Sequence, residues 1–113
     1  HIDLMIYTPN GASNPVPVFL GMSFFGNSSI EVDPGIPNAE GWMRPHRSGA
    51  VKENKPTGEL RGRFLNNWPI EMALRRGYGV ATFYSGDAEP DRRGGGEPRG
   101  GDVDGPHVLA SAR

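Results

Sequence analysis

The chain has 113 residues, enough for one domain with a modest core, and its 17 Gly and 11 Pro residues favour turns at a quarter of all positions. Twelve Lys and Arg residues against 13 Asp and Glu residues give a formal net charge of −1, which excludes a strongly basic nucleic-acid-binding surface and an acidic tail. The absence of Cys excludes disulfide bonds and thiolate metal sites. The longest apolar run, around residues 16–25, is far too short to span a membrane. We therefore expect neither a nucleic-acid partner nor a membrane partner.

The first third of the sequence favours β-structure. Residues 1–7 alternate between apolar and polar side chains, which predicts a strand that ends at the turn residues 8–11. Residues 17–22 are almost continuously apolar, which is typical of a strand buried on both faces in a parallel or mixed sheet covered by helices. Residues 26–60 follow neither a strand period nor a helix period, so we expect a long loop there. Such a loop is uncommon in a compact domain unless it is functional.

One helix is predicted, over residues 68–76. Asn66 and Asn67 are candidate caps for its first turn, and Gly77 is the expected stop. Residues 78–84 then predict another strand. The order strand, strand, loop, helix, strand predicts an α/β fold.

The sequence changes character near its end. Residues 92–113 contain six Gly and two Pro residues and no aromatic residue. Such a segment buries too little apolar surface to offset the entropy lost on ordering. We therefore expect residues 1–91 to form the folded part, and residues 92–113 to be disordered or foreign to the fold.

One serine lies in a sequence that resembles a nucleophile elbow. Residues 21–26 approach the pattern Gly-x-Ser-x-Gly around Ser23, with the second Gly one position late. Ser23, Asp87 and His107 also follow the hydrolase order of nucleophile, acid and base. Nothing in the Gly-rich end of the chain would hold the imidazole of His107 in place. A strand-end serine in a turn is therefore the favoured interpretation of Ser23.

Three alternating carboxylates invite a comparison with a calcium-binding loop. Asp87, Glu89 and Asp91 have the spacing with which an EF-hand loop begins. Positions six and twelve of that loop would be Arg92 and Pro98 in place of the required Gly and Glu. A solvated turn after a strand is therefore the favoured interpretation.

The remaining polar stretches predict no further chemistry. His46 has no second His or Cys at metal-ligand spacing, so we expect an exposed loop histidine. Residues 44–63 contain six Lys and Arg against two Glu without interleaved aromatics, which favours a solvated loop over an RNA or DNA surface. The glycines at 94–96 have no strand before them and no helix after them, so they predict no phosphate-binding loop. We expect no cofactor and no metal.

Six segments in order along residues 1–91 carry a resemblance to a known family. They lie at residues 15–21, 24–27, 33–37, 61–62, 68–71 and 76–91. The most specific is Arg-Gly-Tyr-Gly-Val-Ala-Thr-Phe-Tyr at residues 76–84. The ordered set resembles the glucuronoyl esterases, a carbohydrate esterase family with the α/β-hydrolase fold. The resemblance implies that residues 1–91 are the incomplete N-terminal part of an α/β-hydrolase sheet, with mixed strands and one clear helix.

The resemblance also implies an activity for the parent protein. It would be a secreted or periplasmic serine carboxylesterase that cleaves the ester between glucuronic acid on xylan and alcohols of lignin, with glucuronoxylan as its carbohydrate ester substrate. The family's nucleophile lies on a Gly-Cys-Ser-Arg-x-Gly-Lys type elbow downstream of the matched part, and its acid and His come later. None of these motifs occurs in this chain. We therefore expect no catalytic residue here, and an inactive N-terminal piece that is truncated and frame-shifted near its end.

The same resemblance singles out the loop after residues 17–22. In this fold that loop lies beside the active site and presents backbone N–H groups to an oxyanion. Phe25, Gly26 and Asn27 occupy it here and are the predicted substrate-binding residues, with a plain strand-end turn as the competing interpretation. Trp68 and Tyr84 are candidates for a carbohydrate cleft, although a core role is favoured for both. The alternative function is a small, non-catalytic carbohydrate-binding or structural β-rich module.

Overall fold

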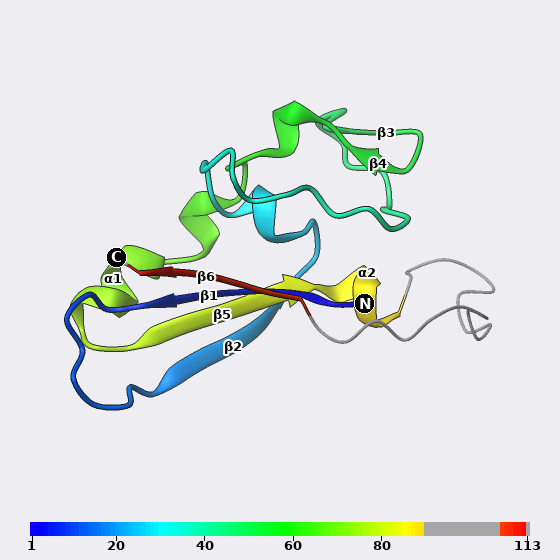
Figure 1. The fold of residues 1–113 in the computed structure, drawn as a ribbon. Coiled ribbons are helices and arrows are strands. Elements are labelled where there is room, and N and C mark those ends of the chain that lie inside the picture. Colours follow the sequence, from blue (N-terminus) through cyan, green and yellow to red (C-terminus); the bar gives the residue numbers. More distant parts are fainter. Residues whose placement is uncertain (90–106, 113) are drawn as a thin grey trace.

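A computed structural model describes residues 1–89 in full and the backbone of residues 107–112. Its sheet strands are Asp3–Thr8 (β1), Val18–Ser23 (β2), Gly79–Tyr84 (β5) and His107–Ala112 (β6). They form a four-stranded mixed sheet in the order β2-β5-β1-β6 (Figure 1). β2 is parallel to β5, β1 is antiparallel to β5, and β6 is parallel to β1.

Three of these strands match the periodicity of the sequence. The predicted strands at 1–7, 17–22 and 78–84 correspond to β1, β2 and β5, and their ends differ by two residues at most. β6 lies inside residues 92–113, the segment for which the sequence predicts disorder or foreign sequence. The other residues of that segment lie outside the part of the chain that the structure describes.

The predicted helix is present but begins two residues later, as α1 at Ile70–Arg75. Its N-terminal boundary residue is Pro69, and no side chain caps it. The prediction that Asn66 or Asn67 would cap α1 is therefore wrong. Both asparagines belong to a separate 3₁₀ turn, η3 at Leu65–Asn67, which ends before the helix begins.

The stop of α1 at Gly77 is confirmed. Gly77 has a φ of 85°, a backbone conformation that glycine adopts with little strain. Its N–H donates to the carbonyl of Leu74, and the N–H of Tyr78 donates to the carbonyl of Ala73. This pair of hydrogen bonds is the Schellman arrangement that satisfies the last carbonyls of a helix.

The long connection between β2 and α1 contains short elements that the sequence does not reveal. They are the 3₁₀ turns η1 (Asn27–Ser29) and η2 (Gly58–Leu60) and the two-residue strands β3 (Val51–Lys52) and β4 (Lys55–Pro56). β3 and β4 form a hairpin whose turn residues, Glu53 and Asn54, both have positive φ, as a type I′ turn requires. A two-residue strand is too short to produce a recognisable alternation.

Two apolar clusters attach this connection to the sheet. One joins β1 and β5 to α1 and the residues after η1; its members are Met5, Tyr7, Ile30, Ile36, Ile70, Leu74 and Val80. The other joins the end of β5 to the hairpin and η2; its members are Met43, Ala50, Val51, Leu60 and Tyr84. Phe64 packs against both clusters. The connection is therefore an ordered layer on one side of the sheet (Figure 1).

The prediction that residues 17–22 are buried on both faces is wrong for this structure. β2 is an edge strand, and Val18, Phe19, Leu20 and Met22 are 46–67% exposed. The reason is that only β5 pairs with β2 among the described strands, so its other edge is open. In the described parts of the chain, no helix is long and apolar enough to cross a membrane.

Candidate functional site

The candidate site begins where β2 ends, at the carboxyl end of the parallel pair β2 and β5. Ser23 is the last residue of β2, and Phe24 and Phe25 form a turn that leads into η1. In α/β sheets, ligands bind outside the carboxyl ends of the strands. The turn therefore occupies the position at which this class of fold builds its binding sites.

Gly26 gives this turn its shape. Its φ of 84° is unfavourable for any residue with a Cβ atom, and a Cβ added there would lie 3.2 Å from the Cβ of Ala39. The carbonyl of Gly26 accepts hydrogen bonds from the hydroxyls of Ser23 (3.0 Å) and Ser29 (2.6 Å) and from the N–H of Ser29 (3.1 Å). Both serine side chains are buried. The turn is therefore held from inside by its own polar groups.

The structure does not assemble a triad around Ser23. Its hydroxyl donates to Gly26 within the same turn. Asp87 accepts a hydrogen bond from the N–H of Asp3 at 3.4 Å. His107 lies on β6, the opposite edge of the sheet from β2, with β5 and β1 between them. Three strand spacings of about 4.8 Å separate the two backbones by roughly 14 Å. In this geometry, Ser23 is a serine at the end of a strand whose hydroxyl is used within the following turn.

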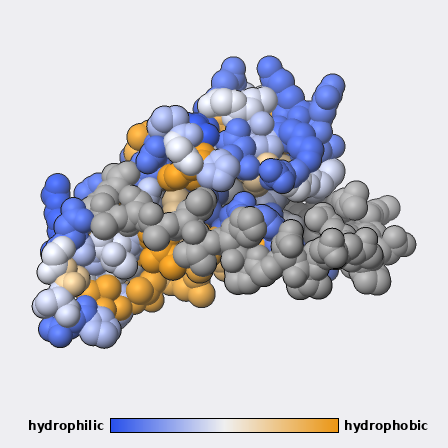
Figure 2. Space-filling model, in the orientation of Figure 1, coloured by the Kyte–Doolittle hydropathy of each residue, from blue (hydrophilic) through white to orange (hydrophobic). Residues whose placement is uncertain are grey.

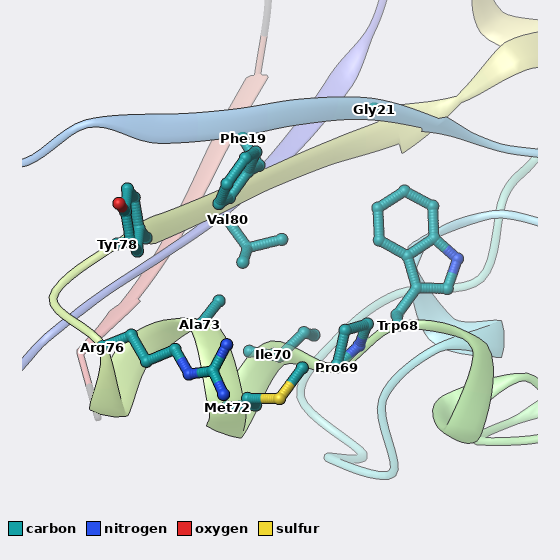
Figure 3. A pocket seen from close by; sticks show the side chains of 10 residues that line it. All are labelled: Phe19, Gly21, Trp68, Pro69, Ile70, Met72, Ala73, Arg76, Tyr78 and Val80. Atoms are coloured by element: carbon teal, nitrogen blue, oxygen red, sulfur yellow. The ribbon is translucent and has the colours of Figure 1, made fainter.

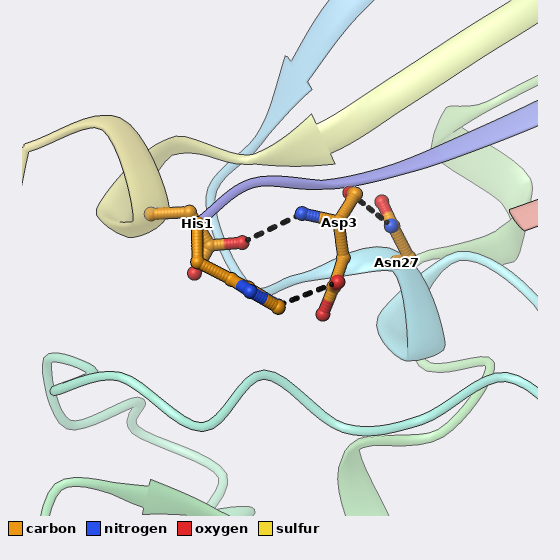
Figure 4. Close-up of polar contacts among 4 residues, drawn as sticks. His1, Asp3 and Asn27 are labelled. Atoms are coloured by element: carbon orange, nitrogen blue, oxygen red, sulfur yellow. Dashed lines mark hydrogen bonds and ion pairs between the residues drawn. The ribbon is translucent and has the colours of Figure 1, made fainter. Parts of the chain in front are cut away.

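Asn27 supports the loop with its side chain. The residue is 5% exposed, its Nδ2 donates to the carbonyl of Asp3 at 2.9 Å, and its Oδ1 accepts from the hydroxyl of Thr82 at 3.4 Å. These bonds join the start of η1 to β1 and β5, as Figure 4 shows for the contact with Asp3. The amide is therefore used within the protein, and the part of Asn27 nearest a ligand would be its backbone.

Phe25 is held by aromatic neighbours. Its ring stacks on Phe64 at a centroid distance of 5.1 Å and meets the edge of His46 at 5.1 Å. The guanidinium carbon of Arg44 lies 5.7 Å from the centroids of both Phe24 and Phe25. Within residues 1–89, the N–H of Phe25 has no hydrogen-bond acceptor. The packing of its ring fixes the position of Phe25, and its N–H is available to donate a hydrogen bond to a ligand.

His46 is not the exposed loop residue that the sequence predicts. It is half-buried because its ring packs against Phe25 and Phe64, and its Nδ1 hydrogen-bonds the hydroxyl of Ser48 at 2.7 Å. The sequence gives no signal for this packing, because His46 and Phe25 are joined only by the folding of the long connection. No group of three His, Asp or Glu side chains with the geometry of a metal site occurs in the described residues.

A small cavity of about 140 Å³ lies beside the turn. Its lining combines buried hydroxyls with aromatic rings, from Ser23, Phe24, Phe25, Ser29, Ile30, Phe64, Asn67 and Trp68. The ring of Trp68 also covers Gly21 of β2 so closely that an added Cβ would lie 2.8 Å from it. Trp68 therefore has both a packing role and a place in the cavity. Tyr84 is a core residue, 4% exposed, whose hydroxyl donates to the carbonyl of Trp42.

The mixed sheet, with its irregular turn at the carboxyl end of a parallel strand, defines an α/β protein similar in fold to the α/β-hydrolase esterases. No family model matches the chain. The chain is 44% identical over 90 residues to carbohydrate esterase MZ0003 from an unknown prokaryotic organism. That match covers 80% of this chain and 21% of the relative.

Solved structures agree with the sequence match. A promiscuous CE15 esterase from a marine bacterial metagenome is 41% identical, with a TM-score of 0.66, over 80% of this chain and 22% of its own. A glucuronoyl esterase from Solibacter usitatus is 33% identical, with a TM-score of 0.65, over 88% of this chain and 26% of its own. The resemblance to the glucuronoyl esterase family is therefore confirmed. The chain spans between a fifth and about a quarter of the length of these relatives.

Proposed function

We propose that the protein to which this chain belongs is a serine carboxylesterase that hydrolyses esters of glucuronic acid in plant cell-wall xylan–lignin, and that it acts outside the cytoplasm. The observation that carries this proposal is the 44% identity to a carbohydrate esterase over 90 residues, matched by structural likeness to a glucuronoyl esterase. The chain contributes the turn at Phe25–Gly26 to the active site. The nucleophile, base and acid lie on other segments.

The chemistry proposed is acyl transfer. A serine oxygen attacks the ester carbonyl carbon while a histidine takes its proton, and the carbonyl oxygen becomes an oxyanion. The N–H of Phe25 donates to that oxyanion, because it is otherwise unpaired and its ring is fixed against Phe64 and His46. The alcohol leaves with a proton from the histidine, and water then releases the glucuronate. Gly26 permits the close approach of the backbone to the substrate.

A first test uses the purified 113-residue chain and the benzyl ester of glucuronic acid. We expect no hydrolysis above the uncatalysed rate, because no His or carboxylate among the described residues hydrogen-bonds the Ser23 hydroxyl. Turnover that Ser23→Ala abolishes would overturn both the assignment of the nucleophile to another segment and the turn role of Ser23.

A second test uses a chimera in which this chain replaces the 90 matched residues of carbohydrate esterase MZ0003. We expect the chimera to hydrolyse the benzyl ester. Phe25→Pro removes the N–H and should lower kcat by about 10² to 10³, the usual effect of losing one oxyanion donor. Phe25→Tyr keeps both the aromatic ring and the N–H and is the matched control, with kcat within a few-fold of the parent chimera. A folded chimera that is inactive contradicts the proposed function.

A further inference from the structure

Within the described residues, the turn after β2 receives little support from the strand that leads into it. β2 is an edge strand, and hydrophobic surface gathers over it (Figure 2). On the side of α1, a cavity of about 520 Å³ lies between the strand and the helix, with Phe19 and Tyr78 at one wall and Met72 at the other (Figure 3). The helix therefore does not pack tightly against β2, and the position of the turn depends on the connection that follows it.

One residue of that connection, His46, packs directly against the turn. Its ring is nearly perpendicular to the rings of Phe25 (82°) and Phe64 (83°), at centroid distances of 5.1 Å and 5.4 Å. Phe25 and Phe64 stack on each other. Stacked and edge-to-face aromatic pairs are favourable and depend on direction. The three rings therefore form one group, in which the ring of Phe25 is held from two directions.

The orientation of the His46 ring is set by a turn of its own backbone. The N–H of Gly49 donates to the carbonyl of His46 at 3.0 Å and closes this turn. The N–H of Ser48 donates to Nδ1 of His46 at 3.2 Å, so Nδ1 is the acceptor and the ring hydrogen lies on Nε2. The Ser48 hydroxyl donates to the same nitrogen at 2.7 Å and accepts from the N–H of the buried Ala50 at 3.2 Å. The ring is therefore tied to the second apolar cluster, of which Ala50 is a member.

From these contacts we propose that His46 is a positioning residue for the oxyanion donor of the esterase. Its ring, oriented by Ser48, holds the ring of Phe25 and thereby fixes the direction of the Phe25 N–H. The donor must point at the oxyanion that forms in the transition state, so a displaced N–H lowers kcat and leaves KM little changed. The proposal rests on the proposed function, because it needs the Phe25 N–H to face the ester carbonyl.

The test measures hydrolysis of the benzyl ester by the chimera of this chain with carbohydrate esterase MZ0003. His46→Ala should lower kcat about ten-fold and leave KM within about two-fold, because the donor is displaced but still present. His46→Phe keeps a ring and should restore kcat to within a few-fold of the parent. His46→Asn keeps an acceptor for the Ser48 N–H without the ring, and its kcat should stay as low as that of His46→Ala. The opposite order would mean that His46 only stabilises its own turn, and would overturn the proposal.

Arg47→Gln is the matched control, because Arg47 is exposed in the same turn and its side chain makes no hydrogen bond among the described residues. It should leave kcat and KM unchanged. A second comparison uses Phe25→Ala, which removes the ring through which His46 acts but keeps the N–H. On that background His46→Ala should lower kcat by less than about two-fold, since the two substitutions break the same contact. Equal losses with and without the Phe25 ring would overturn the proposal.

A measurement without substrate separates this proposal from the proposed function. A para-fluorophenylalanine in place of Phe25 gives one fluorine resonance, which His46→Ala should shift and broaden and Arg47→Gln should leave unchanged. Circular dichroism checks the fold of each variant, and His46→Asn replaces His46→Ala should the latter not fold. An unchanged resonance, or a changed one in a chimera that keeps its kcat, overturns the proposal. A folded chimera in which the resonance changes but no ester is hydrolysed supports the contact and overturns the proposed function.

Discussion

Two adjacent buried serines in η1 use their hydroxyl groups differently. The Ser29 hydroxyl donates to the carbonyl of Gly26, whereas the Ser28 hydroxyl is fully buried and has no hydrogen-bond partner within the described residues. A buried hydroxyl without a partner costs free energy, because the hydrogen bonds it made to water in the unfolded chain are not replaced. The pair therefore offers an internal comparison at one place in the fold.

We expect Ser28→Ala to leave the free energy of unfolding unchanged or to raise it by about 1 kcal/mol, since it removes an unsatisfied group. Ser29→Ala removes a satisfied one and should lower the free energy of unfolding by about 1–2 kcal/mol. Urea denaturation followed by circular dichroism measures both. Equal destabilisation by the two substitutions would show that the Ser28 hydroxyl has a partner in solution.

Arg61, which follows η2, binds the segment after η1 through side-chain hydrogen bonds. Its Nη1 donates to the carbonyls of Asp33 (2.7 Å) and Ile36 (2.9 Å), and its Nη2 reaches the Oδ1 of Asn38 at 3.5 Å. The planar guanidinium can satisfy several acceptors at once, whereas a lysine ammonium is a single point of charge on a flexible stem.

Arg61→Lys should therefore lower the free energy of unfolding by about 1 kcal/mol, even though the charge is kept. Arg63→Lys is the matched control, because Arg63 is exposed two positions away and its side chain makes no hydrogen bond among the described residues. Urea denaturation measures both variants. An equal response of the two variants contradicts the bridging role of Arg61.

At the scale of elements, α1 depends on how it ends. The helix has six residues and no side-chain cap at its start, so the two hydrogen bonds around Gly77 are its main terminal support. Isolated helices of this length are marginal in water. The left-handed conformation of Gly77 is therefore more important here than in a long helix.

Gly77→Ala places a Cβ on a residue with a φ of 85° and should lower the free energy of unfolding by about 1–2 kcal/mol. Nothing lies within 4 Å of the added Cβ, so the effect isolates the backbone conformation. Gly58→Ala also adds a methyl group in open space, but without a positive φ, and is the control. Thermal unfolding followed by circular dichroism compares them, and a loss equal to that of Gly58→Ala contradicts the conformational argument.

The elements that could be predicted from the sequence are long enough to show a period. β1, β2, β5 and α1 each have six residues, and their patterns indicate both type and approximate position. β6 is equally long, but it lies in the Gly-rich segment for which the sequence predicts disorder or foreign sequence. The β3–β4 hairpin and the 3₁₀ turns are too short for that. The caps predicted for α1 were wrong because both asparagines belong to η3. An asparagine can occupy a helix cap or a turn, and its side chain alone does not determine which of the two forms.

The turn after β2 could be predicted from the sequence, but its internal contacts could not. The end of the apolar run at residues 17–22 predicts a strand-end turn, and the structure has a turn at Phe24 and Phe25 followed by Gly26 with a φ of 84°. The amide of Asn27 bonds to Asp3 and Thr82, residues far away in the chain, and the ring of Phe25 packs against His46 and Phe64. Such contacts exist only after the long connection has folded onto the sheet.

At the scale of the whole molecule, the chain is a well-packed layer attached to an open sheet. The apolar clusters on the side of α1 are buried, whereas four apolar residues of β2 are 46–67% exposed: Val18, Phe19, Leu20 and Met22. Exposed apolar surface of this kind promotes self-association. The purified chain should therefore bind a hydrophobic dye such as anilinonaphthalene sulfonate and aggregate as its concentration rises.

We expect a double variant, Leu20→Lys with Met22→Lys, to reduce dye fluorescence several-fold and to delay aggregation. Val32→Lys removes an exposed apolar side chain elsewhere and should change neither by as much. Dye fluorescence and light scattering measure the two effects. If the double variant does not alter aggregation, the surface responsible for self-association lies outside β2.

The place of β1 in the sheet also determines when the sheet can form during synthesis. β1 leaves the ribosome before β5 and β6, yet it lies between them in the sheet, and Met5 pairs with Thr82. β2 likewise waits for β5, since Leu20 pairs with Ala81. Pairings between residues so distant in sequence form slowly, because a large loop must close first. The nascent chain therefore carries β1 and β2 without their partner β5 until Tyr84 emerges. During that interval the apolar side chains of both strands are exposed to aggregation.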